Sequence, residues 1–214
     1  MYWATDPLFG NLFIPRVMKR DRFDKICQYL HVNDTSSNPR KGQPGHDKLA
    51  HVRPLVDHIN QKCSELWNTG SNVSIDEAMI AFRGRLGWRQ YIPSKPTKYG
   101  IKVWMKSDPG NGFCSSFQIY TGRTTKQPEL GLGGRVVSDL VDDLSGTYTT
   151  VNCDNFFSSP ALFLSLLEKK ICARGTVRAD RKGMPPAALF NKKMKIQGES
   201  CHLSEWSPGC LQVA

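Results

Sequence analysis

The chain has 214 residues, enough for one domain with a sizeable core or for one domain with an appended helical segment. Hydrophobic residues make up 39% of it, which is near the globular average, and no apolar run approaches the roughly 18 residues of a membrane span. The 29 Lys and Arg against 19 Asp and Glu give a net charge of +10. This excess favours nucleic acid over a membrane as partner, because no amphipathic basic helix or lipidation motif accompanies it.

The first 70 residues are predicted to be helical on either side of a polar loop. Between residues 15 and 31, apolar side chains recur at approximate helical spacing with basic residues between them. Residues 33–47 collect Asn, Ser, Pro and Gly, which is typical of a surface loop. A second helix is predicted over residues 53–67, with Pro54 in its first turn, where a missing N–H is tolerated.

From residue 72 the pattern changes to short β-rich segments. The predicted strands cover residues 72–76, 101–107 and 113–120, and we expect these three to be adjacent. Helical spacing returns over 133–144 and 160–169, and strand-like sequence over 148–153 and 173–178. Three strands, a helix, a strand, a helix and a strand describe an α/β domain with a mixed sheet.

Two aspartates stand where predicted strands end. Asp76 closes the first strand, and Asp154 directly follows the strand over 148–153. Carboxylates gathered at such an edge can hold Mg²⁺ or Mn²⁺, and paired metals support phosphodiester chemistry. The alternative is that each aspartate caps a turn or helix, the commoner role of an Asp at a strand end.

Aromatic and basic residues alternate in the segment after Asp76. Trp88 and Tyr91 lie among Arg83, Arg85 and Arg89, a mixture that suits base stacking and phosphate contact. The alternative interpretation is an aromatic pair that covers the edge of the sheet.

The cysteines are seven in number, dispersed, and without a C-x-x-C pair, which predicts free thiols in a reducing compartment. A zinc site formed by Cys201, His202 and Cys210 is the alternative, although their spacing matches no zinc-finger pattern. The residues after Met1 lack the basic start and apolar run of a secretory signal.

Seven sequence words carry a family resemblance. They are YWATDPLFG, RDRFDKICQYLHVND, RPLVDHIN, SIDEAMIAFRGR, QYIPSKPTKYGIKVWM, VNCDNFFSS and GTVRADRKGMP. The chain resembles piggyBac-type transposases and their domesticated relatives over nearly its entire length, since these words occur in the family's order and at about its spacing.

The resemblance implies a partial RNase H-like catalytic domain over residues 71–214, a mixed sheet with flanking helices. It also implies that residues 1–70 are similar to the family's dimerisation and DNA-binding part. In such transposases three aspartates bind two divalent metals, Mg²⁺ or Mn²⁺, and cut and join DNA at transposon ends. Asp76 and Asp154 match the first and second of these aspartates.

The same resemblance implies a track for DNA phosphates. Lys95, Lys98 and Lys102 lie in the word that matches the family's YIPSKPTKYGIK, and their charge suits phosphate contacts beside the metal site. Their alternative interpretation is that of solvated surface lysines.

The chain also departs from the family pattern. The family's third aspartate, in a Gly-Gly-Val-Asp type word, has no counterpart here. The only acids after Asp154 are Glu168, Asp180, Glu199 and Glu205, and none stands in a comparable setting. We therefore expect a truncated domain that is inactive by itself, since loss of metal-borne charge stabilisation removes most of the catalysis of such sites.

The resemblance implies a transposase-derived protein that in complete form performs metal-dependent DNA cleavage and strand transfer. Double-stranded DNA is the expected partner, a homodimer is possible, no membrane is involved, and the location is nuclear. Two alternatives stay open: a domesticated, non-enzymatic DNA-binding or chromatin-associated protein, and a decayed transposon relic. A module that only contacts phosphates should bind DNA equally well in the presence of a chelator.

Overall fold

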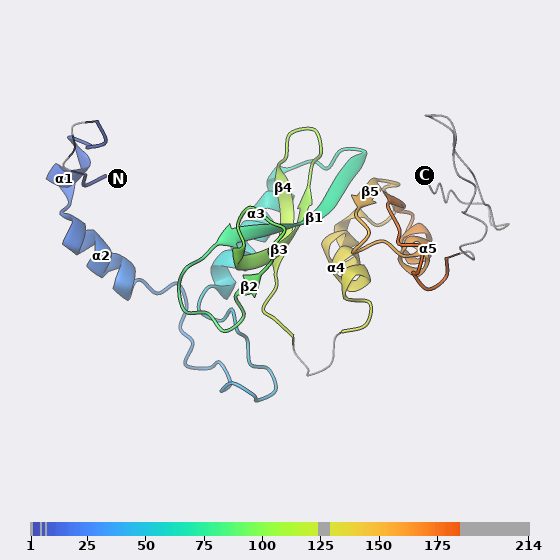
Figure 1. The fold of residues 1–214 in the computed structure, drawn as a ribbon, viewed down its shortest axis with the longest axis horizontal. Helices are drawn as coiled ribbons and strands as arrows, with labels where there is room; N and C mark the ends of the chain where they lie inside the picture. Colours follow the sequence, from blue (N-terminus) through green and yellow to red (C-terminus); the bar gives the residue numbers. More distant parts are fainter. Residues whose placement is uncertain (1, 5, 7, 124–128, 185–214) are drawn as a thin grey trace. The chain divides into compact units, whose positions relative to one another are not determined.

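A computed structural model describes residues 2–4, 6, 8–123 and 129–184 (Figure 1). The chain divides into two compact units, residues 1–57 and 58–214, so that the division falls within helix α3 (Arg53–Leu66). The division into a helical segment over residues 1–70 and a catalytic domain over residues 71–214 remains a prediction. Among the described residues, no helix is both long and apolar enough to cross a bilayer.

The first unit contains two short helices, α1 (Ile14–Val17) and α2 (Arg20–Tyr29), in place of the single helix predicted over 15–31. The helix breaks because Met18 is extended, with φ −149° and ψ 132°. Its carbonyl accepts a hydrogen bond of 2.8 Å from the Trp3 indole, whose ring lies 5.1 Å from that of Phe23. Trp3 therefore stabilises the extended backbone at Met18. Because Trp3 lies outside the two helices, the helical spacing of apolar residues does not predict this break.

The polar loop over 33–47 is ordered by side-chain hydrogen bonds. Asn38 donates to the carbonyl of Asp47 and accepts from its N–H, each at 3.0 Å. The Asp47 carboxylate then accepts from the Arg53 guanidinium at 2.7 and 2.9 Å, and this hydrogen bonding lowers the pKa of Asp47. The ion pair joins the loop to the start of α3.

The second unit is built on a mixed sheet, consistent with an RNase H-like fold. Its strands are β1 (Asn72–Ala81), β2 (Gln90–Tyr91), β3 (Tyr99–Ser107), β4 (Cys114–Ile119), β5 (Thr150–Cys153) and β6 (Cys172–Gly175). Their order is β2-β3-β1-β5-β6, with β4 also paired to β3. β1 is antiparallel to β3 and parallel to β5, and β6 is parallel to β5. The prediction that the first three long strands are adjacent is confirmed, because β1, β3 and β4 pair in turn.

Helices α4 (Leu132–Leu140) and α5 (Pro160–Glu168) lie beside β5 in Figure 1, and α5 packs against β6. The predicted helix over 133–144 ends early, and a short 3-10 turn, η1 (Asp142–Leu144), completes that segment. The start of α5 follows from local sequence, because the Ser159 hydroxyl accepts the Leu162 N–H and Pro160 occupies the first turn.

The core lies between these helices and one face of the sheet. Strand residues Val73, Ile75 and Val151 are almost fully buried there, together with Val137 of α4 and Leu166 of α5. Alternation along β1 follows from this burial, since Val73 and Ile75 point inward while the intervening residues point to the other face. The core thus fixes the register of β1 against β5.

The second half of α3 is tied to the strand β4. The Asn60 side chain donates to the Phe117 carbonyl at 3.0 Å and accepts the Phe117 N–H at 2.8 Å. These bonds satisfy backbone groups of β4, which among the described strands pairs with β3. The rings of Trp67, directly after α3, and Phe113, directly before β4, also stack, with centres 4.6 Å apart.

Candidate metal and nucleic-acid site

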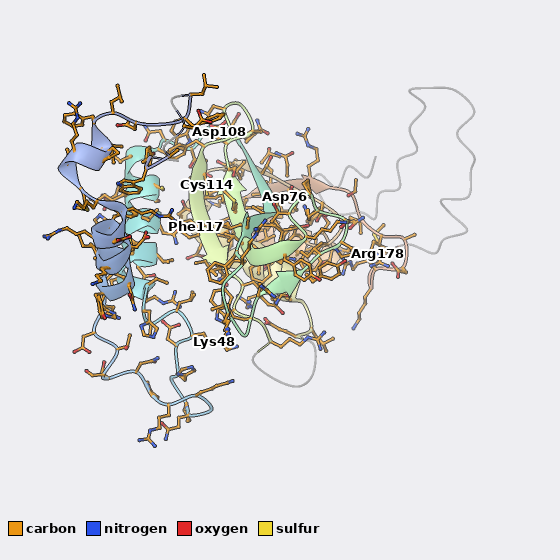
Figure 2. All side chains as sticks on the ribbon, turned by 60° about the vertical axis from the view of Figure 1, so that its left-hand side comes forward. Lys48, Asp76, Asp108, Cys114, Phe117 and Arg178 are labelled. Atoms are coloured by element: carbon orange, nitrogen blue, oxygen red, sulfur yellow. The ribbon has the colours of Figure 1, made fainter. Side chains whose placement is uncertain are left out.

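Asp76 and Asp154 stand at the same level of neighbouring parallel segments, Asp76 within β1 and Asp154 directly after β5. The parallel register of β1 and β5 runs from Asn72↔Thr150 to Ile75↔Cys153, and the two aspartates are the next residue on each chain. Hydrogen-bonded strands lie about 4.8 Å apart, which places the two carboxylates within reach of one ligand. Both residues are exposed, and Figure 2 shows Asp76 on β1.

One detail of the prediction for Asp76 is wrong. β1 does not end at this residue but continues to Ala81, because β3 pairs with it as far as Ala81↔Gly100. It is β5 that stops, at Cys153. Asp76 therefore stands in mid-strand, held by β3 on one side, at the point where its parallel neighbour ends.

Each aspartate has one oxygen engaged by nearby backbone. Asp76 Oδ1 accepts the Glu77 N–H at 2.7 Å, and Asp154 Oδ1 accepts the Phe156 N–H at 2.9 Å. The second bond is that of a turn cap, so the alternative interpretation describes the local geometry of Asp154 correctly. A carboxylate has about four acceptor positions, and a cap of this kind leaves capacity for a cation.

The turn that follows Asp154 is closely packed. Ser158 is fully buried, and both its N–H (3.0 Å) and its hydroxyl (2.8 Å) donate to the Asp154 carbonyl. A Cβ added at Gly175 would lie 2.1 Å from the Cys153 carbonyl oxygen, and one at Gly133 would lie 2.7 Å from that of Phe156. Both positions require glycine because the backbone of this turn approaches so closely. The sequence analysis did not identify Ser158 or either glycine.

Lys95 is held beside the aspartates by an acid that the sequence analysis missed. Its Nζ lies 3.0 Å from Glu77 Oε1 and 3.4 Å from the Glu77 carbonyl oxygen. The hydrogen bond with Glu77 raises the pKa of Lys95, and the charges of Asp76 and Asp154 raise it further. Lys95 is thus an ion-paired cation next to the acidic pair. The sequence does not indicate this position, because Lys95 lies 19 residues after Asp76 in the chain.

Lys102 also lies near the acidic pair, and its side chain packs over two aromatic rings. Its Nζ lies 4.8 Å from the centre of the Phe156 ring and 5.6 Å from that of Trp104. Burial lowers the pKa of Lys102, and the positive charge of Lys95 adds to this, while Glu77, Asp154 and Asp76 act in the opposite direction. A half-buried cation over two rings is not a solvated surface lysine, whereas Lys98 is exposed.

The three arginines lie on the loop between β1 and β2, and all are exposed. The Arg89 guanidinium is 5.5 Å from the centre of the Tyr99 ring. Tyr91 pairs with Tyr99, with ring centres 4.5 Å apart, and Gln90 and Tyr91 pair with β3 at the edge of the sheet. An aromatic pair does lie at the sheet edge, but it consists of Tyr91 and Tyr99 and not of the predicted Trp88 and Tyr91.

The donor set fits a single hard cation. Mg²⁺ is commonly held by one or two carboxylates, with waters and substrate phosphates completing its shell, and Asp76 and Asp154 can supply those carboxylates. Within the described ranges, no three or more His, Cys, Asp or Glu side chains are grouped as metal ligands would be. Asp180 is paired with Arg178 at 3.4 Å, and Glu168 is exposed at the end of α5. Glu199, Glu205, Cys201, His202 and Cys210 lie outside the described residues.

Comparisons with known proteins show similarity to transposases. A family model described as Transposase IS4 matches residues 1–207. The human PiggyBac transposable element-derived protein 3 is 33% identical over 97% of this chain, and human PiggyBac transposable element-derived protein 2 is 30% identical over 85%. A cryo-EM structure of the piggyBac transposase synaptic complex with hairpin DNA is similar with a TM-score of 0.76 and 34% identity over 91% of this chain.

The chain corresponds to part of each of these proteins. It spans 36% and 30% of the two human relatives and 41% of the transposase chain in the complex.

Proposed function

Because the chain belongs to the Transposase IS4 family, within its piggyBac group, we propose that Asp76 and Asp154 together bind one divalent cation. We further propose that the basic residues around them bind the phosphates of double-stranded DNA. The register that brings the two aspartates to the same level of adjacent strands is the observation that carries the proposal. The similarity to a transposase described in a complex with hairpin DNA supports DNA as the ligand.

The positions of the lysines assign different tasks to them. Lys102 is half-buried over Phe156 and Trp104 and is therefore oriented before any ligand arrives. Lys95 is held by Glu77, so it neutralises part of the acidic cluster and lowers the repulsion that a DNA phosphate would meet there. Lys98, Arg83, Arg85 and Arg89 are exposed and suit backbone contacts that position the duplex.

A bound divalent cation would supply charge stabilisation at the phosphate and activate the attacking oxygen. The chain's own residues orient the phosphate by Lys102 and the exposed cations, and they hold the Asp154 carboxylate through the turn that follows it. In complete form, with a third carboxylate, we propose metal-dependent DNA cleavage and strand transfer at transposon ends. We propose that the 214-residue chain alone binds DNA without cutting it, and that it acts in the nucleus.

Binding of a labelled duplex by the purified chain tests this proposal. We expect Mg²⁺ or Mn²⁺ to tighten binding, and Asp76→Asn and Asp154→Asn each to abolish the metal-dependent part. Asp139→Asn is the matched control, because Asp139 is an exposed acid that pairs with Arg135 on α4. Equal binding with metal and with chelator by the unsubstituted chain would contradict the metal site.

A second function has one specific observation in its favour. The described residues contain no three-carboxylate cluster, so a non-enzymatic DNA-binding protein would need nothing beyond the basic surface. That function predicts DNA binding that is unchanged by chelator and by either aspartate substitution. The same binding experiment therefore separates the two functions.

A further inference from the structure

Arg181 reaches back from the loop after β6 to the turn that follows Asp154. Its Nη2 donates to the carbonyl oxygens of Asn155 and Phe156, the latter at 3.2 Å. Two local turns fix the backbone of Arg181, because its N–H donates to the Arg178 carbonyl and its own carbonyl accepts the Met184 N–H, each at 3.0 Å. The Arg181 guanidinium thus contacts this turn although Arg181 lies more than 20 residues further along the chain.

The contact acts on the peptide that orients the Asp154 carboxylate. Phe156 donates its N–H to Asp154 Oδ1, accepts Arg181 at its carbonyl, and places its ring under Lys102. A rotation of this residue would move the carboxylate, the ring and the lysine together. Arg181 opposes such a rotation with a charge-assisted hydrogen bond, which is among the stronger kinds.

The guanidinium makes its hydrogen bonds with the described residues through Nη2. Arg181 Nε is buried and has no hydrogen-bond partner among the residues that the structure describes, and a buried unsatisfied donor lowers stability. Arg181 therefore acts on this turn through its Nη2 contacts. We propose that Arg181 is a positioning residue that fixes the Asp154 carboxylate for cation binding.

This inference rests on the proposed metal site and leads to variants in the full chain. Arg181→Gln removes the contacts, and Arg181→Lys retains one charged donor that can reach a carbonyl. Arg178→Gln is the matched control, since Arg178 lies in the same loop but is exposed and pairs with Asp180. Each variant is measured for Mn²⁺ affinity, for thermal unfolding, and for amide hydrogen exchange in the peptide that covers residues 154–158.

We expect Arg181→Gln to speed exchange in that peptide and to weaken Mn²⁺ binding about 10- to 100-fold, the usual effect of losing a group that orients a metal ligand. Arg181→Lys should recover part of both, and Arg178→Gln should change neither. In an Asp154→Asn background, Arg181→Gln should cause no further loss of Mn²⁺ affinity. A purely structural role would instead lower the unfolding temperature and leave Mn²⁺ affinity unchanged in the folded protein.

Two failures are distinguishable. If the unsubstituted chain binds no Mn²⁺, the proposed metal site is wrong. If it binds Mn²⁺ and Arg181→Gln leaves that affinity unchanged, the metal site stands and the inference about Arg181 is overturned. Should Arg181→Gln fail to fold, the same comparison with Arg181→Lys decides the question.

Discussion

Replacement of Arg83, Arg85 and Lys98 by glutamine should weaken the salt dependence of DNA binding. These three side chains are exposed on the loops that flank β2, whereas Lys95 is ion-paired and Lys102 is half-buried. Each phosphate neutralised on duplex DNA contributes about −0.9 to the slope of log affinity against log salt. Three lost contacts should therefore make the slope shallower by about 2.7.

The magnitude is large enough to measure. Between about 50 and 200 mM salt, a slope difference of 2.7 corresponds to roughly a 40-fold difference in affinity loss. The assay is fluorescence anisotropy of a labelled duplex over a series of KCl concentrations, with the triple variant and the unsubstituted chain measured in parallel.

A control with the same change in charge separates contact from long-range attraction. Lys62, Lys169 and Lys170 can be replaced by glutamine for this purpose, because Lys62 pairs with Glu65 and Lys169 with Asp142, away from the acidic pair in sequence. If both triple variants change the slope equally, net charge rather than the loop surface governs binding. An unchanged slope in the first variant would refute the assignment of these residues to phosphate contact.

Three further predictions follow from the described contacts. Asp143→Ala should lower the free energy of unfolding, measured by urea denaturation, by about 1–3 kcal/mol. The loss should be smaller than for a fully buried ion pair, because Asp143 is 44% exposed although its partner Lys106 is only 1% exposed. A variant that also carries Lys106→Met should recover much of this loss, and a loss below about 0.5 kcal/mol would count against the pair. Burial lowers the folded-state pKa of Lys102, so the unfolded chain holds the extra proton. The free energy of unfolding should therefore rise with pH between that lowered pKa and the ordinary lysine pKa of 10.5. Lys102→Met should flatten this rise, and an identical pH profile would contradict the assignment. The purified chain should not nick transposon-end duplex in Mg²⁺, and reproducible nicking that Asp76→Asn abolishes would show that two aspartates suffice.

Local signals in the sequence account for much of the fold. The helix α5 was predictable because Ser159 and Pro160 are a cap and a first-turn residue, and the meander of β1, β3 and β4 because turn residues separate three β-rich segments. The β2 strand has only two residues and produces no periodicity. The break at Met18 depends on Trp3, a contact across 15 residues that helical spacing does not encode.

The residues of the candidate site likewise fall into those that the sequence indicates and those that only the folded chain brings together. Asp76 and Asp154 were identified from their positions after predicted strands and from the family resemblance. Their proximity depends on the parallel register of β1 and β5, in which the buried core residues Val73 and Val151 are partners. Glu77 and Arg181 gave no signal, because the ion pair with Lys95 and the contacts with the turn exist only in the folded chain.

Iron-mediated cleavage of the protein tests the paired-aspartate metal site most directly. Fe²⁺ bound in place of Mg²⁺ generates hydroxyl radicals in the presence of ascorbate and peroxide, and these cut the backbone close to the bound ion. We expect cuts beside both Asp76 and Asp154, competed by Mg²⁺, and lost at both positions in Asp76→Asn and in Asp154→Asn. Cuts at only one of the two positions, or cuts that persist at both in either variant, would contradict a cation shared by the two aspartates.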